Sequence, residues 1–263
     1  MTIAPAPPGE RLPPERGRAT PPTMISLANP ARFAAFVDRA LPWLAAASAF
    51  GLGLALWQAF FVAPPDYQQG ETVRIMFIHV PAAWLAMFGW TIMSVSSLGV
   101  LVWRHPLADV AAQAAAPLGA AFTLIALITG SLWGKPMWGT WWVWDARLTS
   151  VLVLFLMYLG VMALRAAVDE PARAARLVAV LTLVGFVNIP IIKFSVDWWN
   201  TLHQGESVFR MDGPTIDPSI LIPLLVNAVA YTLLFVTLHL VAMRTELMRR
   251  RLRGLRLRAA EAS

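Results

Sequence analysis

The segment VLVLFLMYLGVMALRAAV, residues 151–168, contains a single charged residue, Arg165, close to its end. A run of this length and composition is typical of a transmembrane helix, because about 20 apolar residues cross a hydrocarbon core of ~30 Å. Helix is the expected state, since an isolated strand would leave its backbone groups without hydrogen-bond partners in lipid. The segment therefore predicts an all-α integral membrane protein.

Further apolar runs along the chain bring the number of predicted transmembrane helices to six. They are expected at about 42–64, 80–103, 112–132, 149–168, 177–193 and 219–243. Only 14% of the 263 residues are charged, against about 25% in a typical soluble domain. The predicted organisation is a disordered Pro- and Arg-rich extension (1–30), a six-helix membrane domain (31–245) and a basic cytoplasmic tail (246–263).

Lysine and arginine are distributed unevenly over the predicted loops. If the N-terminus lies inside, 16 of the 21 basic residues fall on that side. The other side holds the remaining five, which are Arg74, Lys135, Arg147, Lys193 and Arg210. Cytoplasmic loops are enriched in Lys and Arg, so both termini are predicted to be cytoplasmic. Loops at about 65–79, 133–148 and 194–218 then lie on the outer face, which is the periplasm in a bacterium.

Several classes of function are excluded or disfavoured by the same composition. The chain has no cysteine, which rules out disulfides, thiolate metal ligands and a covalent thioether to this chain. The basic runs carry no interleaved aromatic residues, so no nucleic-acid partner is expected. The sequence GSLWGKP (Gly130–Pro136) lacks the spacing and the Ser or Thr of a phosphate-binding loop, and we predict no nucleotide site there.

The predicted middle outer loop begins with WGKPMWGTWWVWDAR, residues 133–147, which holds five of the twelve tryptophans. Tryptophans at a membrane interface are ordinarily anchors. This density, with glycines between the rings, favours instead the wall of a site for a large planar ligand, since each ring offers apolar area and one N–H donor. The candidate binding residues here are Trp133, Gly134, Trp138, Gly139, Trp141, Trp142, Trp144 and Asp145.

Two of the four histidines, His79 and His203, fall on the predicted outer face. A neutral imidazole is a good ligand for haem iron, and two of them could bind opposite faces of one haem. His105 and His239 are expected to be structural or solvated. Asp145 and Arg147 could pair with each other or cap a helix, or they could face the ligand. Candidates for contacts with haem propionates or for the rim of the site are Arg74, Lys135, Arg147, Arg210, Trp198 and Trp199.

Three segments together resemble one known family. WGKPMWGTWWVWDARLTS is similar to the tryptophan-rich WWD signature of haem-handling membrane proteins. HVPAAW (His79–Trp84), KFSVDWWNTLHQG (Lys193–Gly205) and the six spans narrow the resemblance to the family of cytochrome c maturation protein C, also called haem exporter protein C. The resemblance covers about residues 35–245, and the short chain differs from the larger haem lyases of the same superfamily.

The resemblance implies a role in cytochrome c biogenesis at the bacterial inner membrane. Haem b, as cargo, would be held at the periplasmic face by His79 and His203 beside the WWD loop and then delivered to a periplasmic haem chaperone. Implied partners are a small single-span subunit and the ATPase and membrane subunits of an ABC transporter. The family's role favours binding and transfer over enzymatic catalysis. Two alternatives stay open: a transmembrane haem transporter, and an assembly subunit that binds no haem.

Overall fold

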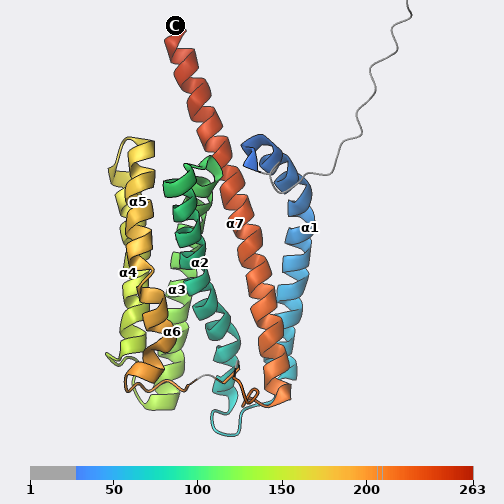
Figure 1. Ribbon diagram of the computed structural model, residues 1–263. Coiled ribbons are helices and arrows are strands. Elements are labelled where there is room, and N and C mark those ends of the chain that lie inside the picture. Colours follow the sequence, from blue (N-terminus) through green and yellow to red (C-terminus); the bar gives the residue numbers. More distant parts are fainter. Residues whose placement is uncertain (1–27, 206, 209, 263) are drawn as a thin grey trace, which may run out of the picture.

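The computed structural model describes residues 28–205, 207–208 and 210–262, which form a bundle of helices (Figure 1). Among these residues, six helical stretches are long and apolar enough to cross a membrane, in agreement with the predicted number of spans. The predicted disordered extension falls almost entirely on residues 1–27, outside the described part. The elements in chain order are α1 (Pro30–Trp57), η2 (Gln58–Val62), η3 (Glu71–Ile75), α2 (Met76–Trp103), α3 (Pro106–Trp138), α4 (Ala146–Ala167), α5 (Pro171–Gly185), α6 (Asn188–Trp198) and α7 (Pro218–Glu261).

The helices extend beyond the apolar runs, because polar caps outside the runs set where they begin. Asn29 accepts from the backbone N–H groups of the first turn of α1, and Asp217 caps α7 through Ser219 N. At its far end α7 runs without a break to Glu261, so the predicted tail boundary at 245/246 falls inside a helix. Likewise α3 continues through Trp138. The predicted loop 133–148 is therefore a loop only over 139–145.

The fifth span is a broken helix, a feature that the apolar run did not predict. α5 ends at Gly185, and α6 begins three residues later at Asn188. Pro190 lies in the first turn of α6, where its missing N–H cannot continue the hydrogen-bond ladder of α5. The side chain of Asn188 donates to the carbonyl of Ser150 on α4 (2.9 Å), which joins the start of α6 to α4. The break lets α6 lean against α4 at the loop end of the bundle.

The two ends of the bundle differ in what they carry. Figure 1 shows the start of α1 and the end of α7 at one end, and the loops 139–145 and 199–217 at the opposite end. This arrangement agrees with a chain whose termini lie on one side of the membrane and whose tryptophan segment lies on the other. That the first side is the cytoplasm stays a prediction.

The end of the bundle that carries the start of α1 and the end of α7 is tied together by an ion-pair network. Asp109 on α3 pairs with Arg165 on α4 (2.5 Å) and with Arg250 on α7 (2.6 Å). Arg250 also pairs with Glu246 on its own helix (2.8 Å). The four side chains are 14–34% exposed, and the acids lie outside the apolar runs. Because each partly buried charge has an opposite charge beside it, the network links three helices.

Close packing of α2 against α3 forms the centre of the bundle. A Cβ built on Gly89 would lie 3.1 Å from the Cα of Gly119, so the two backbones nearly touch there. The fully buried Tyr158 of α4 packs onto this crossing and donates a hydrogen bond to the carbonyl of Ala86 (2.7 Å). Small residues allow such approaches between membrane helices, where packing rather than hydrophobic burial drives association.

We expect Gly119→Ala to destabilise the bundle, because its Cβ would lie 2.1 Å from Oη of Tyr158. Overpacking of this kind costs about 1–3 kcal/mol. Unfolding of the purified protein in detergent would measure the loss. Gly160→Ala on α4 is the matched control, since a Cβ there meets nothing within 4 Å. Equal stability of the two variants would show that the crossing is looser than the structure indicates.

Candidate functional site

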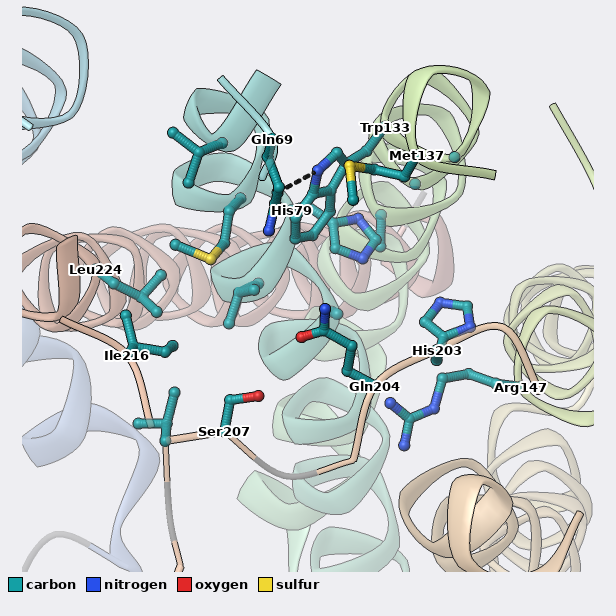
Figure 2. Close-up of a pocket in the computed structure, with 18 of the residues that line it drawn as sticks. Gln69, His79, Trp133, Met137, Arg147, His203, Gln204, Ser207, Ile216 and Leu224 are labelled. Atoms are coloured by element: carbon teal, nitrogen blue, oxygen red, sulfur yellow. Dashed lines mark hydrogen bonds between the residues drawn. The ribbon is translucent and has the colours of Figure 1, made fainter. Parts of the chain in front are cut away.

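A cavity of about 1090 Å³ lies at the loop end of the bundle. It is bounded by α2, α3, α4 and α7 and is covered by parts of the loops before η3 and between α6 and α7 (Figure 2). Ligand pockets for small molecules commonly measure about 300–1,000 Å³, so the space suits a large ligand. The deepest residues lining it are Met87 on α2 and Leu154 on α4, next to the buried core of Trp90 and Tyr158.

His79 lies in the first turns of α2 and lines this cavity. Its Nδ1 is 3.1 Å from Oγ1 of Thr129 on α3. The edge of the Trp133 ring packs against the imidazole, with 5.6 Å between ring centroids. The indole N–H of Trp133 in turn donates to Oε1 of Gln69 (3.0 Å). The histidine ring is therefore held by contacts from α3 and from the loop that precedes η3.

His203 reaches the same cavity from the loop between α6 and α7 (Figure 2). Its Nδ1 lies 3.5 Å from Oδ2 of Asp145, and its ring packs edge-on against Trp138 at 4.8 Å. Burial lowers the pKa of His203 below its ordinary value, and the charge of Arg147 lowers it further. The carboxylate of Asp145 raises this pKa and offsets part of the effect. The lowered pKa favours the neutral imidazole, which is the form that binds a metal.

Asp145 joins two parts of the site. Its Oδ1 accepts from Leu148 N (2.8 Å) and so caps α4. The sequence left open whether Asp145 caps this helix, and the structure shows that it does. Its Oδ2 is buried and has no hydrogen-bond partner within the described residues, and it faces His203. One carboxylate therefore fixes the end of the tryptophan segment and lies against the second histidine.

Arg147 is the arginine of the candidate set that lines the cavity. Its guanidinium donates to Oγ of Ser195 (3.1 Å) and to the carbonyl of Lys193 (3.2 Å), which ties α4 to α6. Figure 2 shows its side chain beside His203. Arg147 therefore places positive charge at the wall of the cavity while it holds the two helices together.

The predicted site residues divide into two groups. Seven of them line the cavity: His79, Trp133, Gly134, Trp138, Trp142, Arg147 and His203. The others lie outside its lining: Arg74, Lys135, Gly139, Trp141, Trp144, Asp145, Trp198, Trp199 and Arg210.

Residues of the second group have identifiable contacts elsewhere. Arg74 pairs with Glu71 (2.5 Å), and Arg210 pairs with Asp212 (2.6 Å). Lys135 donates to the carbonyl of Gly139 (3.0 Å), which ends α3 with a positive φ of 76°. Trp141, Trp144, Trp198 and Trp199 are about half exposed or more. His105 caps α3, and His239 stacks on Phe235 inside α7, so both lie away from the cavity.

Sequence reasoning missed the residues that support the histidines. Thr129 and Gly130 contact His79, and Gly130, Gln69, Met137 and Gln204 line the cavity. A signal for some of them was present: if α3 is continued to 138, Gly130, Trp133 and Met137 recur with helical spacing and share a face. The prediction ended this helix at 132 and so treated the tryptophans as a loop. Gln69 and Gln204 come from loops and gave no periodic signal.

Trp142 also lines the cavity, and its indole N–H is buried without an acceptor among the described residues. An unpaired buried donor costs about 1–3 kcal/mol. Its ring packs edge-on against Trp144, with centroids 5.5 Å apart. The buried N–H is therefore a donor available to a bound ligand.

The two roles of Asp145 can be separated by substitution. Asp145→Ala removes the cap of α4 and should lower the free energy of unfolding by about 0.5–2 kcal/mol. Asp145→Asn should keep most of the stability, because Asn caps helices as well as Asp does. Denaturant titration in detergent would measure both. A loss in the Asn variant as large as in the Ala variant would show that the charge, and not the cap, stabilises the fold.

Comparison with known proteins gives a consistent result. The family model of heme exporter protein C matches residues 23–258. Heme exporter protein C of Bradyrhizobium diazoefficiens is 70% identical over 238 residues, which are 90% of each chain. The Escherichia coli K12 protein of that name is 49% identical over 84% of this chain and 89% of its own. The Paracoccus denitrificans protein is 49% identical over 87% and 95%. With its six apolar helical stretches the chain is a multi-pass membrane protein, and it belongs to the heme exporter protein C family.

Proposed function

We propose that this chain binds haem b as cargo at the periplasmic face of the inner membrane and delivers it to a periplasmic haem chaperone during cytochrome c biogenesis. The observation that carries the proposal is the meeting of two histidines, 124 positions apart in the sequence, in one cavity. Each imidazole has a tryptophan against its edge, Trp133 for His79 and Trp138 for His203. The name of the relatives, heme exporter, agrees with a haem cargo.

The chemistry of the cavity fits a haem. His79 and His203 are the proposed axial ligands of the iron, since bound haem iron is commonly held by imidazole. Apolar and aromatic side chains line much of the remaining space and suit the macrocycle. Arg147 and the unpaired indole N–H of Trp142 are the proposed partners of the propionates. Trp133, Gly134 and Trp138 complete the wall, and Asp145 fixes the segment.

The depth of the cavity favours presentation of haem over its passage through the bilayer. Within the described residues its lining ends at Met87 and Leu154. Below this level Trp90, Met93 and Val161 are fully buried in the core, and the ion pairs of Asp109 close the far end. A transport path would have to open through both. We therefore place haem at one face of the protein, where an acceptor can reach it.

The exposed tryptophans beside the cavity suit a docking protein. Trp141, Trp144, Trp198 and Trp199 are 49–76% exposed, and aromatic side chains are enriched where proteins bind one another. The periplasmic haem chaperone is the proposed partner at this face. A small single-span subunit and the subunits of an ABC transporter are proposed to complete the assembly, and ATP hydrolysis is assigned to the transporter.

Removal of either proposed ligand should abolish stable haem binding. His79→Ala and His203→Ala proteins, purified in detergent, should lose most of their Soret absorption and fail to load the chaperone. His105→Asn is the control, because it keeps a cap for α3 at the opposite end of the bundle. If the two alanine variants bind and pass on haem like the wild type, the ligand assignment is wrong. If the wild-type protein itself shows no Soret absorption, the result would favour the alternative of an assembly subunit that binds no haem and only docks a partner.

The indole N–H of Trp142 should contribute to haem retention. Trp142→Phe keeps an aromatic ring and removes the donor, and should weaken haem binding about tenfold, as expected for a hydrogen bond to a charged group. Trp144→Phe is the matched control, since Trp144 is 76% exposed and lies outside the cavity lining. Equilibrium titration with haem, followed by absorbance, measures both. Equal affinities would remove Trp142 from the proposed propionate contacts.

A further inference from the structure

The ring of His79 is packed against one face of α3. Its Nδ1 is 3.1 Å from the Thr129 hydroxyl oxygen. A Cβ on Gly130 would lie 2.9 Å from Cε1 of the ring, so the imidazole occupies space that another residue would fill. Trp133, one turn further along α3, packs against the ring in a T-shaped contact. Three residues of α3 thus contact His79 and determine how its ring is oriented.

The hydrogen bonds of Thr129 assign the tautomer of His79. A threonine hydroxyl has one proton to donate and can also accept. The Thr129 hydroxyl donates to the carbonyl of Ile125 at 2.7 Å, the shorter of its contacts with Ile125 and His79. Its oxygen then accepts from His79, which requires the proton of the neutral ring to be on Nδ1. The lone pair available for a metal is therefore on Nε2.

We propose that Thr129 is a positioning residue for the haem ligand His79. It holds Nδ1 as a donor and so presents Nε2 to the iron, while Gly130 leaves room for the ring. This inference rests on the proposed function, in which His79 ligates haem iron. The partner that orients a metal-binding histidine through its second nitrogen commonly changes metal affinity 10–100-fold when it is removed. Here that partner is a neutral hydroxyl, whereas Nδ1 of His203 lies 3.5 Å from the carboxylate of Asp145.

The tautomer can be measured without haem, which separates this inference from the proposed function. Histidine-selective nitrogen NMR of the haem-free protein in detergent distinguishes protonated Nδ1 from protonated Nε2, and a His79→Gln spectrum identifies the signals of His79. We expect a protonated Nδ1 in the wild type and in Thr129→Ser. Thr129→Val, which keeps the shape and removes the hydroxyl, should shift the ring towards protonated Nε2. An unchanged protonated Nδ1 in Thr129→Val would overturn the inference.

Haem binding supplies the second measurement. Thr129→Val should weaken haem binding about tenfold and shift the Soret band. Thr129→Ser, which keeps the hydroxyl, should have the haem affinity and the Soret band of the wild type. Thr91→Val is the matched control, because the Thr91 hydroxyl makes the same kind of hydrogen bond to its own helix, at Met87, whereas only the Thr129 hydroxyl of the two also lies beside a histidine nitrogen. Gly130→Ala should also weaken binding, whereas Gly160→Ala should not.

The outcomes of the two proposals differ. If His79→Ala loses haem and Thr129→Val binds it like the wild type, only the role of Thr129 is wrong. If His79→Ala binds haem normally, the ligand assignment fails, whatever NMR reports about the tautomer. A loss of haem in Thr91→Val as large as in Thr129→Val would point to general damage of the helices and would count against the inference.

Discussion

The structure depends on the close approach of α2 and α3. Gly89 and Gly119 bring the backbones almost into contact. Tyr158 of α4 packs against this crossing and donates a hydrogen bond to the carbonyl of Ala86 on α2. The same face of α3 continues through small residues towards the loop end, where Gly130 receives the ring of His79. Packing that stabilises the bundle therefore also places one proposed ligand. A substitution at the crossing should therefore also alter the site, because the crossing and the site are both formed by α2 and α3.

The two histidines reach the cavity in different ways. His79 is part of a helix and is held by Thr129, Gly130 and Trp133 of its neighbour. His203 belongs to a loop and is placed by Asp145 and Trp138, from the two ends of the tryptophan segment. On the proposed function, the iron would therefore be held by one ligand on a helix and one on a loop, with different polar groups near their second nitrogens.

Some elements could be predicted from local pattern, and others could not. The six spans followed from runs of apolar residues, because lipid demands such runs. Their ends did not, since Asn29, His105 and Asp217 lie outside the runs and act through hydrogen bonds. The end of α3 was placed too early, at 132, because the apolar run stops there while the helix continues. In the structure α3 continues to Trp138, and this turn carries Trp133 and Trp138 to the histidines.

The class of the protein, the number of spans and the histidines and tryptophans to be tested could be predicted without coordinates, because they depend on composition and on the chemistry of single residue types. The tertiary structure was needed to show which candidates share a cavity. Arg147 lines it, while Arg74 and Arg210 are paired elsewhere. It also brought in Thr129, an ordinary threonine in an apolar helix, whose importance comes from the ring packed against it. Such contacts join residues 50 positions apart, and no local pattern encodes them.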